Sequence, residues 1–192
     1  KDTLMVMDDF APNGSTADIA RMHGLLERIV RNKGNGQGRQ RMRADTTLRD
    51  LKQSRCCMLV TAEDVPRSHS ALSRLVIIPV AKDDVNTSAL TSAQSHARGG
   101  TYASLMSAYL RWLAPQMSSM PKNLQSRTEK MRQDFVNGAS HKRTPTAAAD
   151  LLVGLDHLLE FAQATELVDG TEAGDMRTRW SQTLKNMAIE QD

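Results

Sequence analysis

Aromatic residues and cysteines are scarce in this sequence. Phe, Trp and Tyr make up 4% of its 192 residues, so its core has to be built from Leu, Met, Val, Ile and Ala. The two cysteines, Cys56 and Cys57, are neighbours in an apolar run. Neighbouring residues of a strand point to opposite faces, so these two are poor partners for a disulfide or a shared metal ion. We expect both to be reduced and to behave as small apolar residues.

Long apolar runs are also absent, and none approaches the ~18 residues that cross a bilayer. The first residues, 1–3, lead directly into an apolar run without the features of a signal peptide. With 40% hydrophobic and 24% charged residues, the composition is typical of a soluble globular protein. We therefore expect a cytoplasmic protein with no membrane partner. Because residue 1 is Lys rather than Met, we also expect the chain to be a fragment of a longer protein.

Positive charge is concentrated in one segment. Residues 28–55 hold nine Lys or Arg and two Asp, a net charge of +7. The whole chain carries +3, so all other residues together carry −4. A basic block inside a mildly acidic protein indicates an anionic partner such as phosphate or nucleic acid. The alternative is a solvated loop face with no partner.

The first part of the chain alternates apolar runs with a helical pattern. Residues 4–7, 56–60 and 75–80 are short continuous apolar runs, which are typical of strands buried on both faces of a parallel sheet. Between the first two runs, a capping hydroxyl and an apolar period of helical spacing predict a helix over residues 16–34. Residues 46–51 suit a second, short helix.

From about residue 86 onward the sequence has helical character. Apolar residues recur at intervals of three and four. They predict amphipathic helices over residues 102–113, 124–135, 151–162 and 176–187. We therefore expect two regions, an α/β region at 1–85 and an α-helical region at 86–192.

Polar side chains stand where the predicted strands end. Asp8 and Asp9 end the first strand, Thr61 ends the second, and Arg74 precedes the third. Because ligands of open parallel sheets bind beyond the carboxyl ends of the strands, we expect these side chains to converge on one crevice. Each of these side chains would have a role next to a magnesium-bound nucleoside triphosphate. The acids hold the metal and orient the attacking water, the hydroxyl positions the γ-phosphate, and the arginine neutralises developing charge.

In their order along the chain, these features resemble the motifs of P-loop ATPases. Residues 4–9 (LMVMDD) look like a Walker B motif, and residues 59–61 (LVT) look like the sensor 1 strand. Residues 70–74 (SALSR) look like a sensor or arginine-finger segment. The wider pattern covers roughly residues 1–115. It resembles the AAA+ or superfamily 3 ATPase domains of primase–helicase proteins of phages, plasmids and integrative elements.

This resemblance implies the C-terminal part of an ATP-dependent DNA helicase or translocase that replicates a mobile element. It implies ATP and Mg²⁺ as ligands of the intact protein, with Asp8, Asp9, Thr61 and Arg74 as catalytic residues. Asp8 and Asp9 would also be the metal ligands. Sensor and finger arginines of such ATPases commonly act across subunits, so the resemblance further implies a homo-oligomeric ring.

One motif of these ATPases is missing. The sequence contains no G-x-x-x-x-G-K-[ST], the loop that cradles nucleotide phosphates and precedes Walker B in the family. We therefore expect this chain to be inactive alone. In the family, the strand before that loop lies between the sensor 1 strand and the strand after the arginine. The resemblance thus implies an α/β fold with an incomplete parallel sheet, in which residues 56–60 and 75–80 flank a gap.

The basic segment lies between the Walker B and sensor 1 resemblances, where superfamily 3 helicases carry a DNA-contacting hairpin. Lys33, Arg39, Arg41 and Arg43 are the residues that we expect to bind DNA through its backbone phosphates. An alternative use of this loop is to reach the nucleotide of a neighbouring subunit.

Two other functions are open on the sequence alone. In a metal-dependent nuclease, Asp8, Asp9, Glu63 and Asp64 would hold two cations for phosphodiester cleavage. In a non-catalytic nucleic-acid-binding module, the basic loop would be the functional element.

Overall fold

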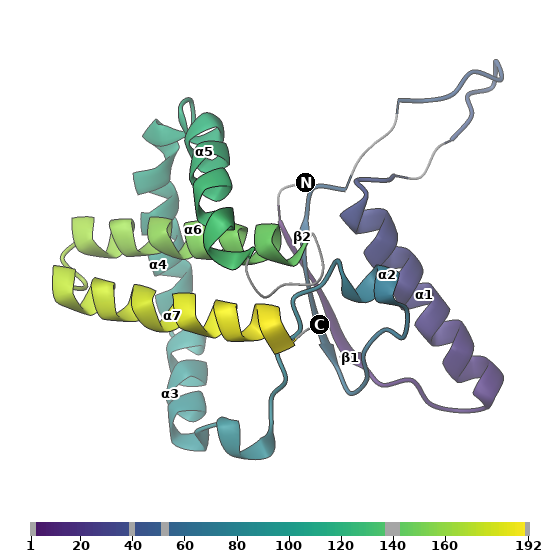
Figure 1. Cartoon of the computed structure of the whole chain (residues 1–192), viewed down its shortest axis with the longest axis horizontal. Helices are drawn as coiled ribbons and strands as arrows, with labels where there is room; N and C mark the ends of the chain where they lie inside the picture. The colour runs from purple at the N-terminus through teal and green to yellow at the C-terminus, as the bar shows by residue number, and fades with distance from the viewer. Residues whose placement is uncertain (1–2, 39–40, 51–53, 137–142, 191–192) are drawn as a thin grey trace. The chain divides into compact units, whose positions relative to one another are not determined.

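The computed structural model describes residues 3–38, 41–50, 54–136 and 143–190. Contacts within the chain divide it into two compact units, Lys1–Val76 (unit 1) and Ile77–Asp192 (unit 2). Over the described ranges, unit 1 holds a two-stranded parallel sheet with helices, and unit 2 is helical (Figure 1). The fold is mixed α/β and mainly helical, with the parallel strands first, as the sequence predicts.

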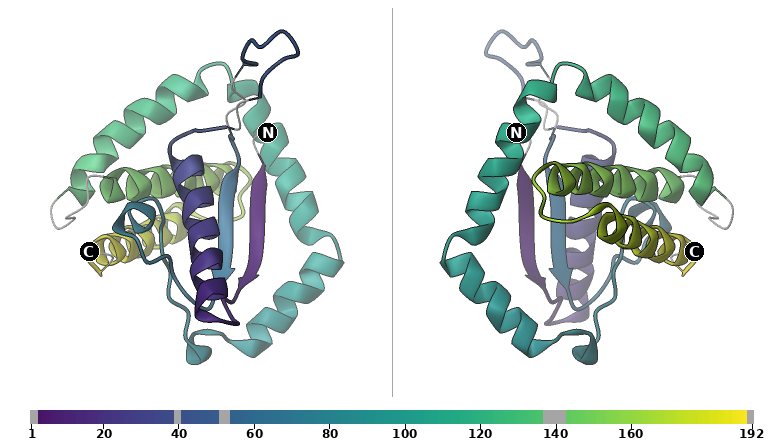
Figure 2. Two further views of the ribbon diagram at one scale, coloured as in Figure 1. Left: turned by 90° about the vertical axis from the view of Figure 1, so that its right-hand side faces the viewer. Right: turned by 90° about the vertical axis from the view of Figure 1, so that its left-hand side faces the viewer.

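The sheet of unit 1 joins two parallel strands, β1 (Leu4–Phe10) and β2 (Cys57–Ala62). Leu4 pairs with Cys57, and the strands run side by side in the same direction (Figure 2). A parallel pair requires a crossover connection, and helix α1 (Thr16–Gly34) lies within it. The prediction that these two apolar runs form adjacent parallel strands is confirmed.

Helix α1 begins where its sequence predicts. The Ser15 hydroxyl accepts a hydrogen bond from the backbone N–H of Asp18 at 3.2 Å and donates one to the Asp18 carboxylate at 2.6 Å. The first bond satisfies an N–H that has no partner inside the helix, and the Asp18 charge lies at the positive end of the helix dipole. Arg31 and Lys33 stand in the last turn, near the negative end.

One face of the sheet packs against α1 and the short helix α2 (His69–Leu72). The apolar side chains that this packing buries are Phe10, Leu26, Val30 and Ala71. Met7, Met58 and Val60 reach the same core from the strands. Each larger side chain buried there contributes about 1.5–3 kcal/mol, so this core fixes α1 over the strands.

The other face of the sheet differs from the prediction. The sequence predicts strands buried on both faces, but Leu4, Val6 and Leu59 are at least half exposed. Alternate strand residues point to opposite faces, and α1 and α2 cover the face that carries the core. The third predicted strand, residues 75–80, does not form. A strand needs a ladder with a neighbour, and in the described residues the sheet contains β1 and β2 only.

Unit 2 is built around helix α6 (Thr144–Ala164), which packs against α5 (Met120–Arg132) and α7 (Gly170–Glu190). The buried apolar side chains of this core are Phe135, Ala148, Ala149, Leu152, Leu155, Leu159, Ala173 and Leu184. Helices α3 (Thr87–Arg98) and α4 (Thr101–Leu113) precede it in the chain. Single-turn 3-10 helices lie at Lys82–Asp84, Ala114–Gln116 and Gln133–Phe135. None of the described helices combines the length and apolar composition needed to cross a bilayer.

All tyrosines and tryptophans of the chain belong to unit 2. Trp112 of α4 stacks on Tyr109 with 6.0 Å between the ring centroids. The Phe161 ring of α6 lies 5.4 Å from Tyr109 and 5.7 Å from Trp112. Such contacts hold α4 against α6, so Trp112 serves as a packing anchor.

A charged network joins the three helices of the unit 2 core. Asp156 of α6 accepts from Nε of Arg177 at 2.8 Å and lies 3.4 Å from Nη2 of Arg127. Arg127 also pairs with Glu160 at 2.8 Å, and Glu160 lies 3.1 Å from Nδ1 of His157. Because the Asp156 side chain is only 9% exposed, the two arginines offset the cost of burying its charge.

Candidate functional site

The carboxyl ends of β1 and β2 carry an irregular pairing. Met7 pairs with Val60 and Phe10 with Ala62, so two residues of β1, Asp8 and Asp9, lie opposite a single residue of β2. This is a β-bulge, which bends a strand and re-aims its side chains. Asp9 has a φ of 59°, in the left-handed region that few residues other than Gly, Asn and Asp adopt.

Thr61 is the residue opposite the two acids. Its hydroxyl accepts a hydrogen bond from the backbone N–H of Asp9 at 2.8 Å and donates one to Oδ1 of Asp8 at 2.5 Å. All three residues are exposed. The structure therefore brings together three of the residues that the sequence selects, and the hydroxyl holds the bulge in place. We name Asp8, Asp9 and Thr61 the acidic edge.

The other two acids of this region have different surroundings. Asp64 Oδ2 lies 3.1 Å from Nε2 of His23, a residue of α1 whose side chain is 4% exposed. The His23 ring meets the Phe10 ring edge-on, with 5.7 Å between centroids. Asp64 thus ties the loop after β2 to α1, and Glu63 donates its backbone N–H to the carbonyl of Phe10 at 3.0 Å.

Sequence reasoning missed His23. The signal was its position, three residues before Leu26 and seven before Val30, on the face of α1 that enters the core. A histidine on a buried helix face needs a polar neighbour, and the Asp64 carboxylate lies 3.1 Å from Nε2 although neither ring nitrogen is in hydrogen-bond geometry.

Glu27, in the next turn of α1, binds the same loop through hydrogen bonds. Its Oε1 accepts from the backbone N–H of Ser68 at 3.0 Å and of Arg67 at 3.2 Å. Burial alone would raise the pKa of Glu27, but hydrogen bonds from Ser68 and Arg67 and the charge of Arg31 hold that pKa below its ordinary value. The carboxylate is therefore charged at neutral pH and orients the start of α2.

Arg74 is held at the end of α1. Its Nη2 donates to Oδ1 of Asn35 at 2.9 Å, and its Nη1 donates to the carbonyl of Ser70 and to the Ser70 hydroxyl. A Cβ on Gly34 would lie 2.7 Å from Cδ of Arg74, so glycine makes room for this side chain. A cation at this end is favoured by the helix dipole.

Arg74 lies away from the acidic edge within this chain. His23 contacts Phe10 at the carboxyl end of β1, and Asn35 follows twelve residues later. At 1.5 Å per residue this corresponds to ~18 Å along the axis of α1. The structure therefore brings Asp8, Asp9 and Thr61 together and holds Arg74 at the other end of α1. A role for Arg74 across a subunit interface stays a prediction.

The basic loop contains a β-hairpin, and the short helix expected at residues 46–51 is wrong, because residues 46–50, the part of that range that the structure describes, are not helical. Met42 and Leu48 form an antiparallel bridge, flanked by hydrogen bonds from Arg43 N–H to the Thr47 carbonyl at 2.8 Å and from Arg49 N–H to the Arg41 carbonyl at 2.9 Å. We call residues 41–49 the hairpin.

The turn of the hairpin explains why no helix forms. Asp45 Oδ1 accepts from the backbone N–H of Thr47 at 3.0 Å and from its hydroxyl at 2.6 Å. Thr46 has a φ of 64°, which ends any helical run. The hydrogen bonds from the Thr47 side chain and backbone hold the pKa of Asp45 below its ordinary value.

The expected nucleic-acid contacts are distributed along this segment. Arg41 and Arg43 are exposed on the first arm of the hairpin, and Arg49 is exposed on the second. Lys33 is half-buried in the last turn of α1. Arg39 lies outside the described residues.

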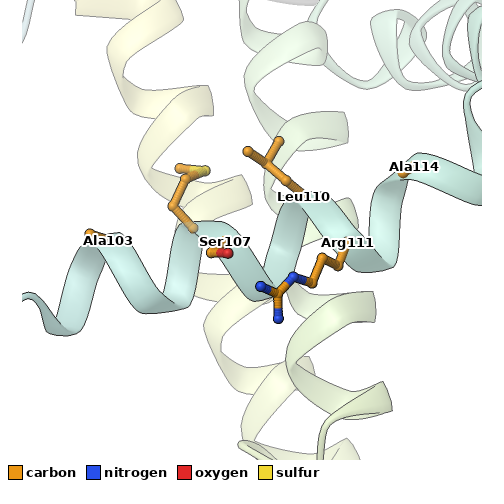
Figure 3. Close-up of a pocket in the computed structure, with 6 residues that line it drawn as sticks. Ala103, Ser107, Leu110, Arg111 and Ala114 are labelled. Carbon is orange, nitrogen blue, oxygen red and sulfur yellow. The ribbon is translucent and has the colours of Figure 1, made fainter.

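A hollow of about 520 Å³ lies along α4. None of the residues that line it is one of the predicted site residues. The residues of α4 that line it are Ala103, Met106, Ser107, Leu110 and Arg111, and Ala114 at the start of the following 3-10 helix completes the lining (Figure 3). Its only charged lining residue is Arg111, so it lacks the acids that a magnesium-bound triphosphate requires.

Over the described ranges, no three His, Cys, Asp or Glu side chains are grouped so that they could hold a metal ion. The acidic edge offers two carboxylates. Comparison of the chain with protein-family models, with curated proteins and with solved structures finds no match. The fold and the local geometry therefore carry the functional argument.

Proposed function

We propose that this chain is part of an ATP-driven DNA helicase or translocase, in which the acidic edge faces the phosphates of the nucleotide. The observation that carries the proposal is the contact of Asp8 and Asp9 with Thr61 at the carboxyl ends of two adjacent parallel strands. Ligands of open parallel sheets bind at this edge. The order of the motifs along the sequence favours a P-loop ATPase over other proteins with such a sheet.

The acidic edge suits Mg²⁺ that arrives with a nucleotide. Magnesium keeps several waters and is usually bound through one or two carboxylates plus substrate phosphates. Asp8 and Asp9 supply two exposed carboxylates, so they are the residues that would hold it. The ion, when bound, supplies positive charge to the phosphoryl group. Thr61 orients Asp8 and fixes the backbone of Asp9, which places both acids before the ligand binds.

In this proposal a longer protein supplies the phosphate-binding loop from residues that precede Lys1, since the 192 residues contain no G-x-x-x-x-G-K-[ST]. The strand before that loop would then lie next to β2. The longer protein would form a homo-oligomeric ring in which Arg74 reaches a neighbour's nucleotide. We infer that it acts in the cytoplasm on the DNA of a mobile element.

DNA binding is assigned to the hairpin. Arg41, Arg43 and Arg49 are exposed on it, and Lys33 lies at the end of the preceding helix. Arginines on such a hairpin bind backbone phosphates without reading sequence, and this binding weakens steeply with salt.

The test uses the longer protein encoded by the natural reading frame. We expect ATP hydrolysis that DNA stimulates, and we expect Asp9→Asn to lower it by about 100-fold or more while nucleotide binding persists. Asp83→Asn, at an exposed acid of unit 2, is the matched control and should leave the rate unchanged. A longer protein without ATPase activity, or an Asp9→Asn variant with full activity, would overturn the proposal.

A second candidate is a non-catalytic nucleic-acid-binding module, and the observation that favours it is the hairpin itself. It predicts salt-sensitive DNA binding by this chain that Arg41→Ala and Arg43→Ala weaken. The two candidates differ in the longer protein, which hydrolyses no ATP if the second one holds.

A further inference from the structure

Helix α4 packs on the rest of unit 2 through its aromatic side. Tyr109 and Trp112 contact the Phe161 ring of α6, with 5.4 Å and 5.7 Å between the ring centroids. No residue of α4 is buried, although the helix is rich in apolar side chains. Met106 and Leu110 are 55% and 54% exposed. The side of α4 that faces away from Phe161 is therefore an apolar helix face that no described residue covers.

Six residues form this face, which we call the α4 seam. Their spacing of i, i+3, i+4, i+7, i+8 and i+11 places them on one side of a helix. They line the hollow of about 520 Å³, and they are Ala103, Met106, Ser107, Leu110, Arg111 and Ala114 (Figure 3). Ala114 continues the helical path, because its backbone N–H donates to the carbonyl of Leu110. The seam is thus about 17 Å long.

The order of side chains along the seam is self-complementary. Consider two copies of α4 that pack antiparallel, with their centre between residues 108 and 109. Ser107 then faces Leu110 of the second copy, so that a small side chain meets a large one. Ala103 faces Ala114 of the second copy, which lets the two helices approach closely at both ends of the seam. Each contact occurs twice, once on either side of a twofold axis.

We propose that the α4 seam is an interface between two copies of this chain, which pack through it antiparallel about a twofold axis. Such an isologous contact uses the same surface on both copies and closes on a pair. The inference goes beyond the proposed function, because a ring is built from heterologous contacts between unlike surfaces. Loss of the pairing would leave the ATPase assignment unaffected, and the reverse also holds.

Arg111 favours the antiparallel arrangement over a parallel one. It is the only charged residue of α4. In a parallel pair the two Arg111 side chains would face each other, and like charges at an interface oppose association. In the antiparallel pair they are about 7.5 Å apart along the axis. The methylene stem of each Arg111 then packs against Met106 of the other copy, while its charged head stays in water.

The composition of α4 disfavours occupants of other kinds. Helices that lie on membranes carry many Lys and Arg on their polar face. Surfaces that bind nucleic acid cluster the same two residue types. In α4 such a charge is present only at Arg111. A protein surface is therefore the better match for the seam, and the pairing of small with large side chains selects a second copy.

The first test is sedimentation of this chain over a range of concentrations. A seam on one helix is smaller than a standard interface, so we expect a dimer with a Kd on the order of 10–100 µM. Met106→Gln with Leu110→Gln keeps good helix formers but removes the large apolar side chains, and it should weaken dimerisation at least about tenfold. Leu158→Gln, at a leucine of α6 that is 45% exposed, is the matched control and should leave the Kd unchanged. Unaltered unfolding midpoints by tryptophan fluorescence show that the variants are folded.

The second test determines the register by disulfide cross-linking, in a background with Cys56→Ser and Cys57→Ser. Two cysteines form a bridge only where their Cα atoms lie within about 7 Å. Ala103→Cys and Ala114→Cys are made as two separate proteins and mixed with oxidised glutathione. The mixture should give a linked pair that joins the two substituted positions, identified by mass spectrometry of the linked peptides. Neither protein alone should form a linked pair, because each position lies about 17 Å along the axis from its own copy.

Three results would overturn the proposal. The first is a chain that stays monomeric well above the expected Kd, and the second is a dimer whose Kd the glutamine variant does not change. The third is cross-linking of either single-cysteine protein with itself in place of the mixed product, which would indicate another arrangement. If the chain instead stays monomeric and binds vesicles of phosphatidylcholine and phosphatidylserine through Met106 and Leu110, the seam is a lipid-binding surface and the pairing is wrong.

Discussion

The hydroxyl of Thr61 bonds to the Asp8 carboxylate at 2.5 Å across the bulge between β1 and β2. The same oxygen accepts the backbone N–H of Asp9 at 2.8 Å. One hydroxyl thus satisfies an amide that the irregular pairing leaves outside the regular ladder, and it orients an acid at the same time. Its removal should loosen the edge of the sheet and leave the rest of the chain unaltered.

Thr61→Val keeps the shape of the side chain and removes both hydrogen bonds. We expect a loss of about 1 kcal/mol in the local stability of unit 1, the usual net contribution of such bonds. The measurement is hydrogen exchange of the Asp9 amide, which should become faster. Thr61→Ser should restore its protection. Tryptophan fluorescence, which reports on unit 2 alone, should give an unchanged unfolding midpoint. Unchanged protection of Asp9 in the valine variant would contradict this account.

Gly34→Ala tests the close approach of Arg74 to the end of α1. In an Arg74→Ala background, alanine has room and should stabilise the helix by about 0.5–1 kcal/mol through its higher propensity. In the wild-type background, the new Cβ would meet Cδ of Arg74 at 2.7 Å and displace the bonds to Asn35, which should offset that gain. Amide exchange in α1 across the four proteins measures the coupling. If Gly34→Ala changes the stability of α1 equally in both backgrounds, the Arg74 side chain moves aside without a loss of free energy.

The turn of the hairpin should depend on pH through Asp45. Its folded-state pKa is held below the ordinary value of 3.8 by the hydrogen bonds from Thr47. A lowered folded pKa contributes stability above the unfolded pKa, and this contribution is lost as the pH falls through the folded pKa. The hairpin should therefore be fully ordered at neutral pH and loosen in acid. NMR titration of the Asp45 carboxyl and of the Thr47 amide measures this. Asp45→Asn should remove the transition, and a midpoint at or above 3.8 would contradict the assignment.

Asp156 should be important for the stability of unit 2. Asp156→Ala leaves Arg127 and Arg177 without their shared carboxylate between three helices. Breaking a fully buried pair costs about 3–5 kcal/mol, and we expect about 2 kcal/mol here because Arg177 is about half exposed. Denaturant unfolding followed by tryptophan fluorescence measures the change. Asp175→Ala, at an exposed acid of α7, is the control and should shift stability by about 0.5 kcal/mol or less. Equal effects of the two substitutions would mean that the network contributes little.

The sequence pattern predicted those parts of the fold that interactions between neighbouring residues stabilise. The Ser15 cap and the apolar spacing after it placed α1, and the apolar runs that end at Asp9 and Thr61 placed the two strands. The adjacency of these strand ends followed from a general property of parallel sheets. The residue pattern alone predicted a short helix where the hairpin lies, because the turn depends on a left-handed residue, Thr46, which the pattern does not reveal.

The sequence by itself determined the strand–helix–strand order, the position of the acids and of Thr61 at strand ends, and the basic character of the hairpin. Each of these depends on the spacing of residues that are near one another in the chain. Only the tertiary structure decided that Thr61 bonds both acids, that His23 pairs with Asp64, and that Arg74 is held at the far end of α1. These contacts join residues about 40 or more positions apart, and packing of the whole unit selects them.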